Sequence, residues 1–200
     1  MSVREEIAAG RLRGEALLER LLAVPFVDRD GWLDAALGFE ELPDDVDLPR
    51  GAVPYLPCGV DEILAMVREV PLTEDAVLVD LGSGLGRVVI LAHLLSGATA
   101  LGLEIQAALV ERARACCGAL KLNRISFECC DVAERRLDGS VFFLYAPFNG
   151  ELLARVLVRL REVAGRRKIV VCAVGLELGE VEWLKERNRA SLTLAIYDSV

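Results

Sequence analysis

Residues 77–87 read VLVDLGSGLGR, and the fold follows from this stretch. An apolar run ends in an acid, Asp80, three glycines follow at every second position, and a long apolar helical pattern begins at Arg87. The pattern predicts a strand, a tight loop and a helix. Glycine has no Cβ, so a ligand can approach the backbone of this loop closely. The helix start offers free N–H groups and the positive end of a dipole, which together predict a ligand-binding loop.

The spacing of the glycines indicates what kind of ligand the loop suits. A dinucleotide fingerprint has the spacing G-x-G-x-x-G, and a phosphate-binding loop ends in Gly-Lys-Ser or Gly-Lys-Thr. Here the spacing is G-x-G-x-G, directly after Asp80, and Arg87-Val88-Val89 supplies no phosphate-loop ending. A negative Asp80 favours a ligand with a cationic end over a pyrophosphate. A glycine-rich turn that binds no ligand is the alternative.

The rest of the chain predicts alternating strands and helices. Strands are expected over residues 76–79, 99–103, 125–130, 141–145, 169–174 and 192–197. Helices are expected over residues 61–70, 87–95 and 107–120, and an amphipathic helix is expected after residue 145. This alternation predicts an α/β fold in which helices cover both faces of a parallel sheet. Residues 176–190 show no pattern that assigns them.

A separate N-terminal segment precedes the α/β pattern. Residues 4–23 have a helical pattern that Gly10 and Gly14 weaken. An acidic, proline-containing loop then leads into the main body. We expect two parts, which are a helical extension or cap over residues 1–50 and a ligand-binding domain over residues 51–200.

Three of the predicted strands lead into an acid, namely Asp80, Glu104 and Asp131. Ligands of parallel sheets bind at the carboxyl ends of the strands, so these acids are expected in one site. Glu104 lies 18 residues after Gly86, where a carboxylate can accept from both ribose hydroxyls of an adenosyl group. Glutamate is a poor helix N-cap, which favours the ligand role. For Asp131 the alternative is a loop acid or an N-cap.

The form D-x-G-S-G-x-G-R resembles the first motif of the class I S-adenosylmethionine (SAM) methyltransferases. The resemblance implies a Rossmann-like sheet of seven mostly parallel strands and SAM as the cofactor. It also implies that the loop packs on the amino-acid end of SAM, that the acid lies near the ammonium group, and that Asp131 accepts from the adenine amino group. The implied cofactor-binding residues are Asp80, Gly82, Ser83, Gly84, Gly86, Arg87, Glu104 and Asp131.

The loop VPYLPCGVDEI at residues 53–63 narrows the resemblance. It resembles the SAM-covering loop of the seven-strand, non-SET lysine methyltransferases, which are the histone-type enzymes and their mitochondrial and prokaryotic relatives. The resemblance covers residues 53–175 and is specific for SAM binding. A packed loop aromatic is the alternative role for Tyr55. The candidate catalytic residues around the acceptor are Tyr55, Glu62, Tyr145 and Asn149.

The fourth predicted strand bears on the class of acceptor. It runs into Tyr145-Ala146-Pro147-Phe148, whereas amino-methylating nucleic-acid enzymes have Asn, Asp or Ser before Pro-Pro and an aromatic residue. The amide or acid that would hold a nucleobase amine is therefore missing. The net charge of −8 also repels a phosphate backbone. We expect no nucleic-acid partner, and we interpret the basic cluster from Arg155 to Lys168 as a solvated face.

The composition of the chain bears on its cellular location and on whether it binds a metal. No apolar run reaches the ~18 residues that a membrane span needs, and the charged N-terminus carries no export signal, so we expect a cytoplasmic protein. None of the six cysteines forms a C-x-x-C pair, and we expect no metal site. The cysteines are interpreted as small buried hydrophobes, and His93 as a structural residue of an apolar helix.

The leading hypothesis is a SAM-dependent methyltransferase that N-methylates a protein lysine by in-line displacement. A small-molecule methyltransferase of the same fold is the first alternative. A module that binds SAM or a nucleotide without turnover is the second, and an NAD-dependent oxidoreductase is the third. The identity of the acceptor, the number of methyl groups and the oligomeric state are left open by the sequence.

Overall fold

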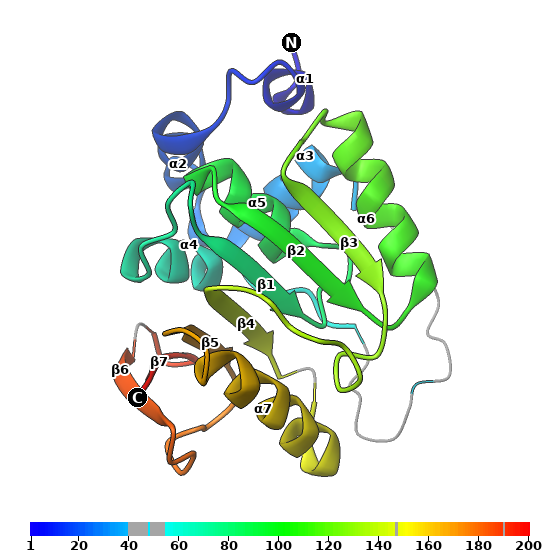
Figure 1. Cartoon of the computed structure of the whole chain (residues 1–200). Helices are drawn as coiled ribbons and strands as arrows, with labels where there is room; N and C mark the ends of the chain where they lie inside the picture. Colours follow the sequence, from blue (N-terminus) through cyan, green and yellow to red (C-terminus); the bar gives the residue numbers. More distant parts are fainter. Residues whose placement is uncertain (40–47, 49–54, 147, 190) are drawn as a thin grey trace.

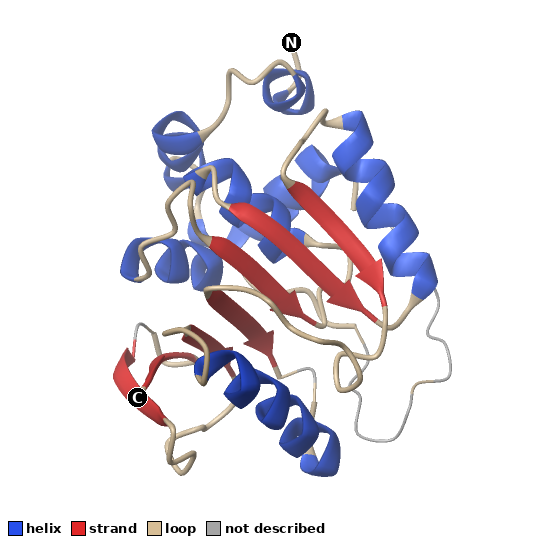
Figure 2. Cartoon of the chain, viewed as in Figure 1, coloured by secondary structure: helices blue, strands red, loops and turns tan. Residues whose placement is uncertain are grey.

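The computed structural model describes residues 1–39, 48, 55–146, 148–189 and 191–200 (Figure 1). The features expected of residues 40–47, 49–54 and 147 lie outside the described residues. Seven strands form one sheet in the order β3-β2-β1-β4-β5-β7-β6 (Figure 2). The strands are β1 Val77–Leu81, β2 Thr99–Glu104, β3 Ile125–Cys129, β4 Val141–Tyr145, β5 Val170–Val174, β6 Leu184–Arg189 and β7 Leu194–Ser199.

Five strands of the sheet are parallel, and β7 runs antiparallel to both β5 and β6. The α/β fold with a seven-stranded, mostly parallel sheet is therefore confirmed. Strand β1 lies between β2 and β4, and Asp80 is in register with Gly102 on one side and Phe143 on the other. The predicted first strand ended too early, because β1 continues to Leu81 and takes Asp80 into the sheet.

Helices cover both faces of the sheet and create two cores (Figure 2). One core joins the first face to α4 Val60–Glu69, α5 Arg87–Ser96 and α6 Ala107–Ala119, together with the N-terminal helices. The second joins the other face to α7 Gly150–Ala164 and to the connection before β4. Alternate residues of β1 serve the two cores, since Leu78 belongs to the first and Val79 to the second.

The N-terminal segment packs directly on the sheet-covering helices (Figure 1). It consists of α1 Val3–Ala8, α2 Gly14–Leu22, the 3-10 turn η1 Phe26–Asp28 and α3 Arg29–Leu37. The single helix expected over residues 4–23 is wrong. The chain breaks between α1 and α2, where Gly10 and Gly14 take left-handed φ angles of 73° and 54°. Glycine reaches this conformation without steric cost, and a continuous helix cannot contain it.

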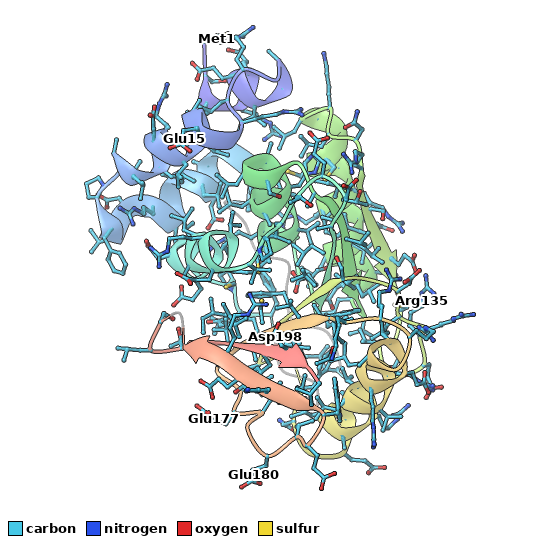
Figure 3. The ribbon with its side chains drawn as sticks, turned by 60° about the vertical axis from the view of Figure 1, so that its left-hand side comes forward. Met1, Glu15, Arg135, Glu177, Glu180 and Asp198 are labelled. Carbon is cyan, nitrogen blue, oxygen red and sulfur yellow. The ribbon has the colours of Figure 1, made fainter. Side chains whose placement is uncertain are left out.

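A hairpin of β6 and β7 completes the sheet. Its first strand, β6, lies in the stretch that the sequence pattern did not assign, and Figure 3 shows the hairpin in the lower part of the view with Asp198 labelled. Arg187 Nε of β6 donates to Asp198 Oδ2 of β7 at 2.9 Å. The predicted last strand, over residues 192–197, begins two residues late in the structure, because Ser191 Oγ accepts from Thr193 N and Leu194 N and holds the turn.

Within the described residues, none of the helices is both long and apolar enough to cross a membrane.

Candidate active site

A cavity of about 780 Å³ opens at the carboxyl ends of the parallel strands. Its walls come from the loops that follow β1, β2, β3, β4 and β5, as well as from the turn before β7. A second cavity of about 20 Å³ adjoins it and shares Tyr55, Leu56, Gly82 and Tyr145 with it. The expected site residues that line the large cavity are Tyr55, Gly82, Glu104, Asp131, Tyr145 and Asn149. Those that line only the small cavity are Asp80, Ser83 and Arg87.

The glycine loop is held in a tight turn over the end of β2. The amides of Gly82 and Ser83 both donate to the carbonyl of Leu103, at 2.8 Å and 3.0 Å. Gly84 has a left-handed φ of 53°, and a Cβ on it would lie 2.0 Å from Cε2 of Tyr55. Only glycine therefore lets the Tyr55 ring rest on the loop. Gly84 and Gly86 line neither cavity. Gly84 leaves room for Tyr55, and Gly86 leaves room for the ring of Phe127.

Tyr55 lies between the two cavities and is mostly buried. Burial raises the pKa of its phenol to about 12, and the positive charge of Arg87 opposes that rise. The ring is thus neutral at physiological pH and acts as an apolar cover for the loop with a hydroxyl as its one polar group.

Two buried acids stand at the base of the site. Asp80 is 2% exposed, and its pKa is raised well above the ordinary range by burial first and by the charge of Glu104 second. A cation placed beside Asp80 would ionise it and be held by it. This arrangement suits a ligand with a positive end.

Glu104 ties the glycine loop to the start of α6. Its Oε2 accepts from Gly84 N at 2.9 Å, and its Oε1 accepts from Ile105 N and Gln106 N at 2.8 Å and 2.9 Å. A carboxylate offers about four lone-pair sites, so three of them are occupied here. The site that remains is on Oε2, where Glu104 can accept from a ribose hydroxyl. The contact with both ribose hydroxyls stays a prediction.

Arg87 points toward the N-terminal segment. It is 4% exposed, and it donates to Cys58 O at 2.7 Å and to Asp34 Oδ2 at 2.5 Å. Asp30 lies 3.4 Å from its guanidinium. The partners of Arg87 thus come from α3 and from the loop before α4, which no local sequence pattern around residue 87 indicates.

Asp131, which follows β3, also lines the large cavity. Its Oδ1 accepts from Ala133 N at 2.9 Å, as the alternative of a loop acid anticipated. Asp131 lines the cavity as well, so the turn and a ligand contact are compatible. Gln106 and Cys130 line the same end and were not expected there.

The wall opposite the acids carries the expected acceptor residues. Tyr145 ends β4, and burial is the largest cause of the rise in its pKa. Asn149 is the N-cap of α7, and its side chain makes no cap hydrogen bond. Ala146, between them, has a left-handed φ of 39°, a conformation that costs a residue with a Cβ about 1 to 3 kcal/mol and that collects at functional sites.

Thr193 is a site residue that the sequence analysis missed. It lines the large cavity from the turn before β7, and its Oγ1 donates to Glu62 Oε1 at 3.0 Å. Glu62, in the first turn of α4, lines neither cavity and reaches the site only through this contact. The two residues are far apart in the chain, so only the turn signal around Ser191 hinted at this placement.

The basic cluster is more than the solvated face that was expected. Arg155 lines the large cavity and pairs with Glu134. Arg159 donates to Ala133 O at 2.8 Å, and Arg166 donates to Leu137 O at 3.2 Å. The cluster therefore anchors the connection between β3 and β4 to α7.

The cysteine interpretation needs one correction. Cys58, Cys116, Cys117 and Cys172 are buried, but Cys129 is exposed and Cys130 is partly exposed at the cavity. Cys129 and Cys130 lie at the end of β3, which is an edge strand of the sheet, so little of the protein covers them. His93 is buried, and its Nδ1 lies 2.7 Å from Ala98 O, in agreement with a structural role.

Comparison with known proteins adds to this geometry. The family model described as "Histone methylation protein DOT1" matches residues 58–128, which span α4, the glycine loop and the first three strands. The chain is similar to an RNA methyltransferase from Salinibacter ruber solved with S-adenosyl-L-homocysteine, with 26% identity and a TM-score of 0.55. That alignment covers 72% of this chain and 92% of the other. No curated protein matches the chain.

Two further solved structures share the fold at lower identity. A SAM-dependent methyltransferase from Aquifex aeolicus is 14% identical, with a TM-score of 0.54 over 68% of this chain and 88% of its own. MtNAS, solved in complex with MTA and tNA, is 11% identical with a TM-score of 0.57. That alignment covers 98% of this chain and 69% of the other, so the likeness to MtNAS includes the N-terminal segment.

Proposed function

We propose that this chain, a SAM-dependent methyltransferase of the class I fold that resembles the histone-type lysine methyltransferases, methylates the side-chain amine of a protein lysine. The observation that carries the proposal is the hydrogen bond by which Thr193, in the wall of the large cavity, donates to the carboxylate of Glu62 behind it. A lysine enters such a site as a cation, and a carboxylate attracts it. The amine must lose a proton before it can act as a nucleophile, and the Thr193 hydroxyl would accept that proton while it passes its own to the Glu62 carboxylate.

The described residues fit SAM as the cofactor. Its amino-acid end is cationic at the ammonium group, which suits the buried carboxylate of Asp80. The same end carries a carboxylate, and Nε of Arg87 is buried without a hydrogen-bond partner beside the small cavity. Glu104 has an acceptor site left for a ribose hydroxyl, and Asp131 lines the large cavity and would accept from the adenine amino group.

Bound SAM supplies a methyl group that is activated by a positive sulfur. The protein mainly has to bring the amine into line and keep it unprotonated. We assign Tyr145 and Asn149 to orient the amine by hydrogen bonds, because both line the cavity at the end of β4. We assign Thr193 and Glu62 to take up its proton.

Exposed apolar side chains beside the cavity favour a protein over a small molecule as the acceptor. Leu56 lines the cavity and is 63% exposed, and Leu192, next to Thr193, is 96% exposed. A metabolite that fits into the cavity would leave these side chains in water, whereas a protein segment would cover them.

The likeness to a named RNA methyltransferase makes RNA the second candidate to test. The arginine that lines the cavity, Arg155, is already paired with Glu134, and the chain carries a net charge of −8. Both features weaken the attraction for a phosphate backbone.

The test is methyl transfer from methyl-tritiated SAM into a cell lysate, with the products separated by protease, by nuclease and by size. Asp80→Ala, which should lose SAM, is the negative control. Label that protease removes and that Asp80→Ala abolishes would support the proposal, and hydrolysis of the labelled protein would place the label on lysine. Label that only nuclease removes, or label confined to small molecules, would overturn it.

A further inference from the structure

We propose that α3 of the N-terminal segment is part of the cofactor site, because Asp34 and Asp30 position Arg87 to receive the carboxylate of the amino-acid end of SAM. The inference rests on SAM binding and not on the identity of the acceptor. It assigns Asp34 and Asp30 as positioning residues, which act through Arg87 and do not touch the cofactor.

The positive charge of Arg87 costs free energy at its position unless negative groups lie beside it. Arg87 is the first residue of α5, and a cation at a helix N-terminus faces the positive end of the helix dipole. It is also almost fully buried, which costs further free energy for an ion without partners. Asp34 compensates the charge from α3 through a hydrogen bond, and Asp30 adds an ion pair at 3.4 Å.

The hydrogen bonds leave one nitrogen of the Arg87 guanidinium without a partner in the described part of the chain. Its Nη2 donates to Asp34 Oδ2 and its Nη1 donates to Cys58 O. Its Nε has no partner among the described residues and is buried. Arg87 lines the small cavity together with Asp80 and Gly82, which is the part of the site proposed for the amino-acid end of SAM. An unpaired buried N–H of a cation is costly, and a ligand carboxylate would relieve that cost.

Asp30 also ties α3 to a second helix. Asp30 Oδ1 accepts from Val60 N at 2.7 Å, at the first residue of α4. The helix α3 therefore holds the starts of both α4 and α5, and between them lies the Cys58 carbonyl that Arg87 also binds. A change in α3 is transmitted to the loop that carries Tyr55 and to the small cavity.

A neighbouring ion pair provides a matched comparison. Arg29 of α3 pairs with Asp61 of α4, on the same helix–helix contact, and neither residue lines either cavity. Loss of this pair weakens the packing of α3 without changing the partners of Arg87. A variant that loses the Arg29–Asp61 pair therefore separates a general loss of stability from a loss of affinity for the cofactor.

The experiment compares two ligands by isothermal titration calorimetry, with the melting temperature measured in parallel. SAM carries the amino-acid end, and 5′-methylthioadenosine lacks it. For Asp34→Asn we expect SAM to bind about tenfold more weakly, while the Kd of 5′-methylthioadenosine stays within about twofold of the wild-type value. Asp61→Asn should lower the melting temperature without changing the ratio of the two Kd values.

Equal weakening of both ligands by Asp34→Asn would overturn the inference, and so would unchanged binding of both. Asp30→Asn gives the same comparison if Asp34→Asn does not fold, because the Asp30 side chain is 55% exposed and its replacement disturbs the core less. No acceptor is present in these measurements, so their outcome is independent of whether lysine is the methylated group.

Discussion

The ring of Tyr55 rests on Gly84, and a Cβ on Gly84 would come within 2.0 Å of Cε2 of that ring. Tyr55 and the glycine loop therefore fit together only while residue 84 has no side chain. Gly84→Ala should displace Tyr55 and strain a backbone with a φ of 53°, at a cost of about 1 to 2 kcal/mol for the strain alone. We expect SAM to bind about tenfold more weakly, as measured by calorimetry.

Gly118→Ala is the control for that substitution. Gly118 lies in α6, and a Cβ there would meet nothing within 4 Å. This variant should keep its affinity for SAM and gain up to about 1 kcal/mol of stability, because alanine is the better helix former. Wild-type affinity in Gly84→Ala would show that the contact with Tyr55 has no bearing on the cofactor.

Asp80 should make stability and SAM affinity depend on pH in opposite directions. Burial, and then the charge of Glu104, raises the pKa of Asp80 in the folded protein. An acid whose folded-state pKa is raised stabilises the protein at low pH, and this contribution is lost as the pH rises through that pKa. The cationic end of SAM binds the ionised form, so the affinity for SAM rises over the same interval.

Thermal denaturation over a series of pH values, with and without SAM, measures both trends. In the wild type, the melting temperature of the free protein should fall with rising pH while the shift caused by SAM grows. Asp80→Asn should flatten both curves, since asparagine does not titrate. A SAM-induced shift that is independent of pH in the wild type would refute the assignment of Asp80 to the cationic end.

Removal of the Thr193 hydroxyl should slow methyl transfer without changing cofactor binding. Thr193→Val keeps the shape of the side chain but loses the hydrogen bond to Glu62. We expect kcat to fall by about tenfold or more, with an unchanged Kd for SAM, and Thr193→Ser to restore most of the rate. Transfer into lysate protein provides the readout.

Thr73→Val serves as the control for Thr193, because Thr73 is an exposed threonine in the connection between α4 and β1. Glu62→Gln should slow the reaction as much as Thr193→Val does, and the double variant should be no slower than either single one if the two residues act as a unit. Additive losses would contradict a shared proton path.

The N-terminal segment should unfold together with the sheet. Leu17 of α2 is fully buried in the core that also contains α5 and one face of β1. Leu17→Ala should therefore lower the free energy of unfolding by about 2 to 5 kcal/mol, and urea should still produce a single transition. Leu22→Ala, at a mostly exposed position of the same helix, should cost less than about 1 kcal/mol. A separate early transition would assign residues 1–39 to an independent unit.

The parallel part of the fold was predictable because its signals are local. The strand over residues 141–145 is an unbroken run of apolar and aromatic residues, and its bounds are confirmed. By contrast, β6 reads LKERNR and pairs only with β7 at the edge of the sheet. An edge strand that faces water needs no apolar alternation, so its sequence gave no β signal.

The site was predictable in part for a related reason. The glycine loop and the acids that follow the strands are fixed by spacing along the chain, and topology alone places them together. The partners of Arg87 come from α3, and the partner of Glu62 comes from a turn 131 residues away. Contacts of this kind depend on how the layers pack, which no short stretch of sequence encodes.

The position of β7 affects the order in which parts of the sheet can form during synthesis. β7 is synthesised last of the seven strands, yet it lies between β5 and β6. As the chain leaves the ribosome, the elements proposed to hold SAM are complete by about residue 131, while the edge of β5 stays unpaired until residues 194–199 are made. The residues proposed for the cofactor can thus come together early in translation, whereas Thr193, proposed for the acceptor, reaches its place only when β7 joins the sheet.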